Sequence, residues 1–491
     1  MHPVVGRHGL LRLAASTAAI VGMLVVTTTM VAGFGFLAPS KKLEFGLAIG
    51  ALWLLFVLAV LALRRAPLRA AVVVIVAGSV LLGIAGMTGP PDTSTDSARY
   101  AWDGIVQAAG ISPYAHVPAS DALASLRPDW LFPHPVAGAD GVLRCLQPRT
   151  HLITLRPSGD MICTAINRAG VPTIYPPLAE IAFLLVRLVV GASAAYWPLQ
   201  LLGVLLSVGV TVLLLAGLRR RGLDPRWAAL WALNPLVISE AVTNSHIDVL
   251  GALLALAAAF WISGGRRWRG GILLGAAIAA KLIPVLAVPA LLRRQPWKVV
   301  LAAGATFAVL YVPYVLTTGI GVLGYLPGYL NEEGYDDGSR FVLLTAFLPG
   351  TVALPVAAVL LAALAVAVVI RTDAERPWLG QVVMIGTTLL LVSPRYPWYA
   401  LLLIPFIVMS GRWEWMAVPL ALGLHVVLTP TVAFRISLLA AAMIIAAGWW
   451  LRRRHARRLG DATRTLDAST DTTDTTGGAH GPAADRTGTA R

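Results

Sequence analysis

The chain has 491 residues, of which 57% are hydrophobic and 13% charged, and its mean hydropathy is +0.75. Several apolar segments reach the roughly 20 residues that cross a bilayer as a helix. These runs are unbroken, without the alternation of apolar and polar residues that marks a transmembrane β-barrel. The sequence therefore predicts an all-α polytopic integral membrane protein, a bundle of about 13 helices with a large first extracytoplasmic loop.

A net charge of +15 could indicate a nucleic-acid partner, but the positions of the basic residues indicate another cause. They gather in short segments beside the apolar runs, as the positive-inside rule predicts for cytoplasmic loops. Membrane topology therefore explains the charge, and we expect no nucleic-acid partner. The basic segments are 64–69, 219–226, 266–269, 293–298 and 451–458.

The first three spans are predicted near residues 11–36, 43–63 and 69–88. The first apolar run is too long for a signal peptide and lacks a small-residue cleavage site, so we expect a retained helix. The basic segment between the second and third spans places that connection and the N-terminus in the cytoplasm, although Lys41 and Lys42 then lie outside. The third span therefore leads to the outer face.

Residues 89–172 form the predicted extracytoplasmic loop. The loop holds seven Asp and six Arg, a balance unlike that of the basic inner segments. It also contains both cysteines of the chain, Cys145 and Cys163. Two cysteines in an oxidising compartment often pair, and a metal site needs more ligands than these, so we expect a disulfide.

The segment 174–191 is the difficult one. If both this segment and the next apolar segment, 195–218, crossed the membrane, the basic run 219–226 would lie outside. We therefore expect 174–191 to lie at the interface or to re-enter. Arg187 within it fits a partly wet position better than bare lipid.

The remaining segments alternate regularly between the two faces. Domain boundaries follow: N-terminal helices at 1–68, a membrane core at 69–451, and a disordered cytoplasmic tail at 452–491, rich in Thr, Ala, Gly and Asp. The predicted spans and loops of the core are 227–243, 248–263, 270–292 as two short helices, 298–316, an outer loop at 317–350, then 351–370, 377–393, 399–410, 415–429 and 432–451.

Once the chain is oriented, unusual polar and aromatic residues gather on the outer face. They predict a composite site, with scattered loop polarity as the alternative. Asp96, just after the third span, is a candidate general base, or else part of a helix N-cap with Thr95. Arg99 and Asp103 share a helical face with Asp96, which suits a charged or sugar-like substrate and equally a structural ion pair.

Further candidates come from later outer segments. His246 and Asp248 lie in "TNSHID", and Lys281 interrupts an apolar segment, where a phosphate or carboxylate partner or snorkelling is expected. Arg395 in "SPRYPWY" suits phosphate oxygens, whereas Trp398 and its neighbours also suit an interfacial aromatic belt. Tyr114 and Tyr175, next to prolines, are candidate walls for a sugar ring or simply the entry to a helix.

No Walker loop, dinucleotide glycine fingerprint, HExxH or Cys/His metal spacing is present in the sequence. A nucleotide-driven pump is therefore not expected, and an enzyme here needs an activated donor that already resides in the membrane. We expect no cofactor and no metal, although the acidic run "NEEGYDD" keeps a divalent cation open.

In their order along the chain, "RYAWDGIVQAAGISPY", "TIYPPLAE", "NPLVISEAVTNSHID", "AAKLIPVLAVPALLRR" and "SPRYPWYALLLIPF" resemble the motifs of GT-C superfamily glycosyltransferases. The chain looks most like glycosyltransferase family 87 and its relatives, which include polyprenol-phosphate-mannose-dependent mannosyltransferases of envelope glycolipid synthesis. The resemblance covers roughly residues 69–451, and the first two spans look like an addition to the common core.

The resemblance implies a plasma-membrane enzyme with cytoplasmic termini and an extracytoplasmic active site. A polyprenyl-phosphate sugar, with mannose expected before arabinofuranose or a glucose-type sugar, would be transferred to an envelope glycolipid, polysaccharide or protein. Asp96 takes the place of the general base, with Asp103 second. Arg395, with Arg340 and His246, would offset charge on the leaving phosphate. The other expected substrate contacts are Arg99, Tyr100, Tyr114, Tyr175, Asp248, Tyr396 and Trp398.

Two other classes remain open. A transporter or flippase of lipid-linked sugars explains the spans, Lys281 and the aromatic turns, but explains the long Asp-rich loop less well, and the sequence shows no obvious inverted repeat. A non-catalytic scaffold for envelope assembly is the third. Loss of function on replacing Asp96 would argue against it.

Overall fold

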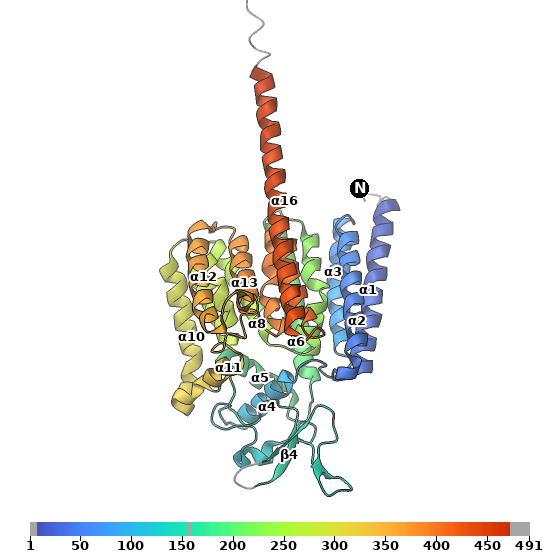
Figure 1. The fold of residues 1–491 in the computed structure, drawn as a ribbon, viewed down its shortest axis with the longest axis vertical. Coiled ribbons are helices and arrows are strands. Elements are labelled where there is room, and N and C mark those ends of the chain that lie inside the picture. The colour runs from blue at the N-terminus through green and yellow to red at the C-terminus, as the bar shows by residue number, and fades with distance from the viewer. Residues whose placement is uncertain (1–6, 155–158, 472–491) are drawn as a thin grey trace, which may run out of the picture.

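The computed structural model describes residues 7–154 and 159–471. Figure 1 shows a bundle of roughly parallel helices, with a smaller part that contains the strands at one end and α16 projecting from the other. We call the end that carries residues 87–176 and 319–349 the loop face, and the opposite end the basic face. Both the start of α1 and the projecting end of α16 lie at the basic face (Figure 1).

The first three helices form where the apolar runs predict them. They are α1 (Arg7–Phe34), α2 (Lys42–Leu63) and α3 (Leu68–Gly86). Each buries one stripe against the others and leaves the rest apolar and exposed, as lipid-facing helices do: Met23, Phe56 and Ile75 are buried. At the basic face Arg12 donates a hydrogen bond to the backbone oxygen of Arg65.

Seven helices in the described residues are long and apolar enough to cross a membrane, and a bent pair would make eight. The expected count of about 13 is therefore not confirmed. The break expected within 270–292 is present at Pro284, and the expected span 399–410 begins in a 3₁₀ turn before the helix Ile404–Ser410, which has Pro405 in its first turn. The seven are Arg7–Phe34, Pro39–Leu63, Leu68–Gly86, Trp197–Arg220, Pro296–Glu332, Gly350–Arg371 and Thr431–Arg457.

The first large loop is a folded unit with its own small core. It contains α4 (Asp96–Ala108) and two antiparallel hairpins, and Trp102, Leu131, Phe132 and Ile166 are buried in it. A disulfide between Cys145 and Cys163 joins the two hairpins, as the sequence predicts. The strands are β1 (Val136–Ala137) with β2 (Leu143–Arg144), and β3 (His151–Thr154) with β4 (Met161–Thr164).

The segment after the loop forms α5 (Pro177–Val190), which has 14 residues and is not among the candidate spans. It lies beside α4 beneath the bundle (Figure 1). The helices approach so closely that a Cβ at Gly104 would meet the backbone oxygen of Phe183 at 2.5 Å. Arg187 is not in a wet position: it is buried and donates to backbone oxygens of Gly191, Ala194 and Ala195, which closes the turn into α6.

The rest of the bundle alternates between the two faces. α16 continues past residue 451, where the tail was expected to begin, and residues 472–491 of that tail lie outside the described part of the chain. The helices are α6 (Trp197–Arg220), α7 (Ala229–Ala232), α8 (Asp248–Ser263), α9 (Arg267–Ala280), α10 (Pro296–Thr318), α11 (Leu326–Glu332), α12 (Gly350–Arg371), α13 (Trp378–Val392), α14 (Ile404–Ser410), α15 (Ala417–Leu424) and α16 (Thr431–Asp471).

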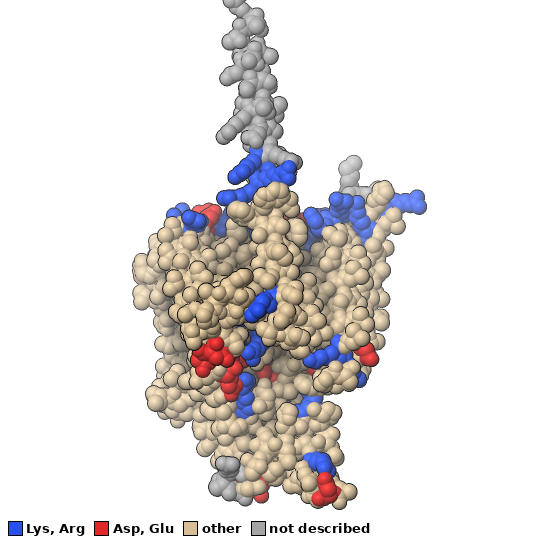
Figure 2. Space-filling model, viewed as in Figure 1, with Lys and Arg blue, Asp and Glu red and all other residues tan. Residues whose placement is uncertain are grey.

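Charge divides the molecule as the sequence predicts. Figure 2 shows Lys and Arg gathered at the end from which α16 projects, whereas Asp and Glu are more frequent toward the loop face. The polar residues that the sequence singles out therefore lie together at the end away from the basic segments.

Candidate functional site

A cavity of about 570 Å³ lies at the loop face, where the folded loop meets the bundle. Segments far apart in the sequence line it, because the chain returns to this face after each pair of helices. Its wall comes from the start of α4, the entry to α5, the end of α9, α11 and the turn after α13. Asp96, Arg99, Tyr175, Arg395, Tyr396 and Trp398, all predicted site residues, line it.

Among the residues that line this cavity, Asp96 is the one with a carboxylate side chain. It is the first residue of α4 and Thr95 is the N-cap residue, as the alternative interpretation predicts, although Thr95 makes no capping hydrogen bond through its side chain. Tyr175 Oη donates to Asp96 Oδ2 at 3.3 Å, and Asn167 Nδ2 to Oδ1 at 3.4 Å. With a side chain 17% exposed, Asp96 is held by neighbours and still reaches the cavity.

Arg99 and Asp103 lie on the same face of α4 as expected, and they form an ion pair. Arg99 Nε is 3.4 Å from Asp103 Oδ2, and Arg99 also donates to the backbone oxygen of Val171 at 2.6 Å. Asp103 is buried behind the cavity beside Glu180. We call Asp103 and Glu180 the acid pair.

Both side chains of the acid pair are buried, and burial shifts their pKa values. Burial raises the pKa of Asp103 to about 6, although Arg99 opposes the shift. Burial and the nearby Asp103 raise the pKa of Glu180 well above its ordinary value. Both carboxyl groups therefore resist ionisation, and Arg99 favours the charged form of Asp103.

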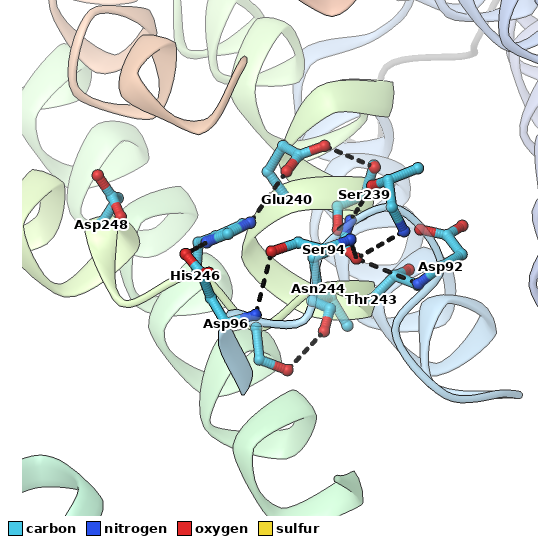
Figure 3. Close-up of polar contacts among 12 residues, drawn as sticks. Asp92, Ser94, Asp96, Ser239, Glu240, Thr243, Asn244, His246 and Asp248 are labelled. Carbon is cyan, nitrogen blue, oxygen red and sulfur yellow. Dashed lines mark hydrogen bonds and ion pairs between the residues drawn. The ribbon is translucent and has the colours of Figure 1, made fainter. Parts of the chain in front are cut away.

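A broken helix brings His246 to the cavity from inside the bundle. Residues Val237–Thr243 form a π-helix, bent by 113° from α8, and Ser245 adopts a left-handed φ of 59° at the break. His246 is fully buried. Its Nδ1 lies 3.8 Å from Asp96 Oδ2, and its Nε2 lies 3.4 Å from Glu240 Oε2 (Figure 3).

Asn244 ties this break to the segment that leads into α4. Its Oδ1 accepts hydrogen bonds from the backbone N–H groups of Asp92, Thr93 and Ser94, at 3.1–3.2 Å (Figure 3). Ser94 Oγ in turn accepts from the backbone N–H of Asp96 at 3.2 Å. Through these bonds the π-helix fixes the position of the Asp96 backbone.

Lys281 ends α9 and lines the cavity. The carboxylate partner expected for it is Asp248, whose Oδ2 is 3.2 Å from Lys281 Nζ. The ammonium also lies 5.0 Å from the centre of the Tyr175 ring. The pair explains how a cation is retained at this depth.

The turn after α13 supplies aromatic rings and a further cation. The rings of Tyr396 and Trp398 stack with centroids 4.5 Å apart, and Trp398 stacks on His246 at 3.8 Å. Arg395 Nη2 donates to Ser339 Oγ at 3.3 Å. Within the described chain, no carboxylate lies within 4.0 Å of the Arg395 guanidinium. Its charge therefore faces the cavity uncompensated at close range.

Comparison with known families decides what kind of protein carries this site. Residues 173–394 match the model for Glycosyltransferase family 87. This match over 222 of the 491 residues supports membership of glycosyltransferase family 87. The family 87 match includes Tyr175, His246 and Lys281, whereas Asp96 and the turn from Arg395 lie outside it. No curated protein and no solved structure matches the chain.

Five predicted substrate contacts do not line the cavity: His246 and Asp248, described above, and three more. Tyr100 is buried behind Tyr175, with its Oη 3.5 Å from His246 Nδ1. Tyr114 Oη donates to the backbone oxygen of Tyr175 at 2.5 Å. Arg340 is buried in an ion pair with Glu333. In this structure the three side chains support the wall rather than form it.

The family 87 chain also contains cavity residues that sequence reasoning missed. Arg168 lines the cavity and joins the first loop to α11 through Glu332, with Nε 2.7 Å from Oε2. Tyr329 and Tyr399 line it as well, joined by a hydrogen bond of 3.0 Å. Glu240 lies within "NPLVISEAVTNSHID", but a single Glu in an apolar run gives no sign of which His it will face.

Metal-ligand clusters were also sought. Within residues 7–154 and 159–471, no group of three or more His, Cys, Asp and Glu side chains is arranged to hold a metal ion. In the acidic run that kept a cation open, Glu332 pairs with Arg168 and Glu333 with Arg340.

Proposed function

We propose that this family 87 glycosyltransferase transfers a sugar, mannose in the first instance, from a polyprenyl-phosphate donor to an envelope glycolipid or polysaccharide. The loop face would be extracytoplasmic, with both termini in the cytoplasm. The observation that carries the proposal is the position of Asp96: one accessible carboxylate in a cavity lined by aromatic rings and by Arg99, Lys281 and Arg395.

The reaction follows from the chemistry of these groups. Asp96 removes the proton from an acceptor hydroxyl, and the oxygen attacks the anomeric carbon of the sugar. The bond from that carbon to the phosphate oxygen breaks, and polyprenyl phosphate leaves with the electron pair. One displacement inverts the anomeric centre.

The cationic side chains act on the leaving phosphate, on the opposite side of the anomeric carbon from the attacking hydroxyl. Negative charge grows on the leaving phosphate as the bond breaks, and Arg395, which lines the cavity, is placed to offset it, although Asp337 acts on its charge from farther away. Lys281 lines the same cavity and adds a second positive charge, partly balanced by Asp248. Tyr175, Tyr396 and Trp398 provide flat apolar surfaces suited to a sugar ring or an isoprene unit.

A transfer assay tests this proposal. Purified protein in lipid is offered radiolabelled polyprenyl-phosphate sugars and membrane-extracted acceptors, and wild type is compared with Asp96→Asn. We expect transfer that falls at least ~100-fold in the variant, the scale of a lost general base. Equal transfer by both proteins would move the base elsewhere. Absence of transfer, with movement of the labelled lipid between leaflets, would make the chain a flippase.

A further inference from the structure

Two buried side chains behind the cavity have no role in the reaction as written above. Glu240 and His246 lie inside the bundle, and neither lines the cavity. Burying a carboxylate is costly unless it is paired, so its partner indicates what it serves. The partner is the imidazole: His246 lies between Glu240 and Asp96 (Figure 3).

We propose that Glu240 and His246 form a positioning dyad for Asp96, an inference that rests on Asp96 being the general base. Glu240 Oε2 lies 3.4 Å from Nε2, a charge contact without a hydrogen bond in this structure, and the Nδ1 edge of the ring faces Asp96. When Asp96 has taken the proton of the acceptor hydroxyl, its new O–H can donate to Nδ1. The dyad therefore orients the carboxylate and stabilises the form that the reaction produces.

The carboxylate of Glu240 is itself fixed. Ser239 Oγ donates to Glu240 Oε1 at 2.9 Å, which leaves Oε2 for His246 Nε2 at 3.4 Å. A carboxylate at that position favours the proton on Nε2 and leaves Nδ1 as the acceptor.

The contact from the ring to Asp96 is at present longer than a hydrogen bond, at 3.8 Å. Catalytic hydrogen bonds often tighten only in the complex with substrate. The groups facing Asp96 are Tyr175 and Asn167 at its two oxygens, with Lys281 farther away as the nearby cation. His246 is thus the imidazole that the described chain places beside Asp96.

The face of the imidazole adds a second restraint. Trp398 stacks on it with ring centroids 3.8 Å apart and planes 23° apart, and Tyr396 continues the stack toward the cavity. Because one ring contacts the base with its edge and the aromatic wall with its face, a shift of His246 would disturb both. We expect the contact from Glu240 to Nε2 to restrain the imidazole against such a shift.

A purely structural role for Glu240 is less consistent with its contacts. Asn244 already ties the π-helix to the segment before Asp96, through three backbone N–H groups. The Glu240 carboxylate contacts Ser239 Oγ and the His246 ring, and its charge also acts on Asp92. Its carboxylate therefore acts on the imidazole rather than on the backbone.

A kinetic double-mutant cycle in the transfer assay tests the dyad, with kcat and the KM for polyprenyl-phosphate mannose measured in lipid. We expect Glu240→Gln to lower kcat ~10–30-fold and to change KM less than ~2-fold, because the amide keeps the shape but not the charge. In an Asp96→Asn background the same substitution should cost less than ~2-fold, since it acts through Asp96. A structural role would instead give losses that multiply.

Glu414→Gln is the matched control, because Glu414 is also 3% exposed but pairs with Arg452 at the basic face. It should leave kcat unchanged. Ser239→Ala, which removes only the donor to Glu240, provides a milder test and should lower kcat a few-fold, again without a further loss in Asp96→Asn.

The outcomes separate the two proposals. A wild type without transfer overturns the proposed function, and the dyad with it. A wild type that transfers, with Asp96→Asn inactive and both Glu240→Gln and Ser239→Ala at wild-type rates, overturns the dyad alone.

Discussion

The acid pair and the dyad are both buried beside the cavity, yet their surroundings differ. Glu180 of the acid pair accepts hydrogen bonds from Thr173 at 2.8 Å and Gln107 at 2.9 Å, and Asp103 pairs with Arg99. The ionisable side chain nearest to Glu240 of the dyad is His246, and the His246 ring faces Asp96. The hydrogen bonds and the ion pair of the acid pair are all made within the fold. The dyad instead faces the accessible carboxylate of Asp96 through the His246 ring. Burial alone therefore does not mark a functional acid.

The largest effect should come from breaking the acid pair. Asp103→Ala removes the partner of Arg99, which is itself buried, so we expect a loss of about 3 kcal/mol in the free energy of unfolding. The transfer rate per folded molecule should stay within ~5-fold of wild type. Thermal unfolding and specific activity of the same purified sample check both. A collapse of kcat at unchanged stability would instead make Asp103 the base.

The next effect concerns Lys281, which lines the cavity and pairs with the buried Asp248. Lys281→Met should raise the KM for the donor roughly 10-fold, because a phosphate loses one nearby cation while Asp248 stays. Lys298→Met, on α10 at the basic face, is the control and should behave as wild type. Equal KM values for the two variants would limit Lys281 to balancing the charge of Asp248.

A smaller effect tests a third buried carboxyl, Asp92, which lies outside the spans next to Asn244. Burial, with help from Glu240, raises the pKa of Asp92 to about 7. Because the folded protein keeps this proton where the unfolded chain has lost it, Asp92 lowers stability as pH rises from about 4 to about 7. Asp92→Asn should therefore raise the Tm by about 2–4 °C at pH 8 and by less at pH 5. A shift that is the same at both pH values would contradict this assignment.

Removal of divalent cations is expected to have the smallest effect, leaving the transfer rate unchanged. Because Glu332 and Glu333 are engaged by Arg168 and Arg340, we propose that transfer needs no divalent cation. Dialysis against EDTA should leave the rate within ~2-fold of the untreated enzyme. A rate lost to EDTA and restored by Mg²⁺ or Mn²⁺ would show that these ion pairs open to bind metal.

Particular residues show how far the sequence leads. The first three helices, the Cys145–Cys163 pair and a carboxylate partner for Lys281 were predictable, because long apolar runs, paired cysteines and a cation in an apolar segment each have few solutions. Asp96 was placed beside the cavity by its position after a span. The break at Pro284 was predicted, since 270–292 was expected as two short helices. The π-helix was not predictable, because local apolar composition does not distinguish it from an α-helix.

The site residues divide in the same way. Tyr100, Tyr114 and Arg340 lie near the cavity but behind its wall, and a sequence does not tell which side of a wall a side chain takes. Arg168 and Glu240 were missed for a related reason. Their partners, Glu332 and His246, are brought to them by the packing of separate segments rather than by spacing along the chain.

The disulfide between the hairpins gives this protein a built-in reporter of sidedness. A cross-link between Cys145 and Cys163 forms where thiols are oxidised, and both sulfurs belong to the loop that covers the cavity. In intact cells, a membrane-impermeant maleimide should therefore label the chain after mild reduction and not before. The chain has no other cysteine, so the label needs no engineered site.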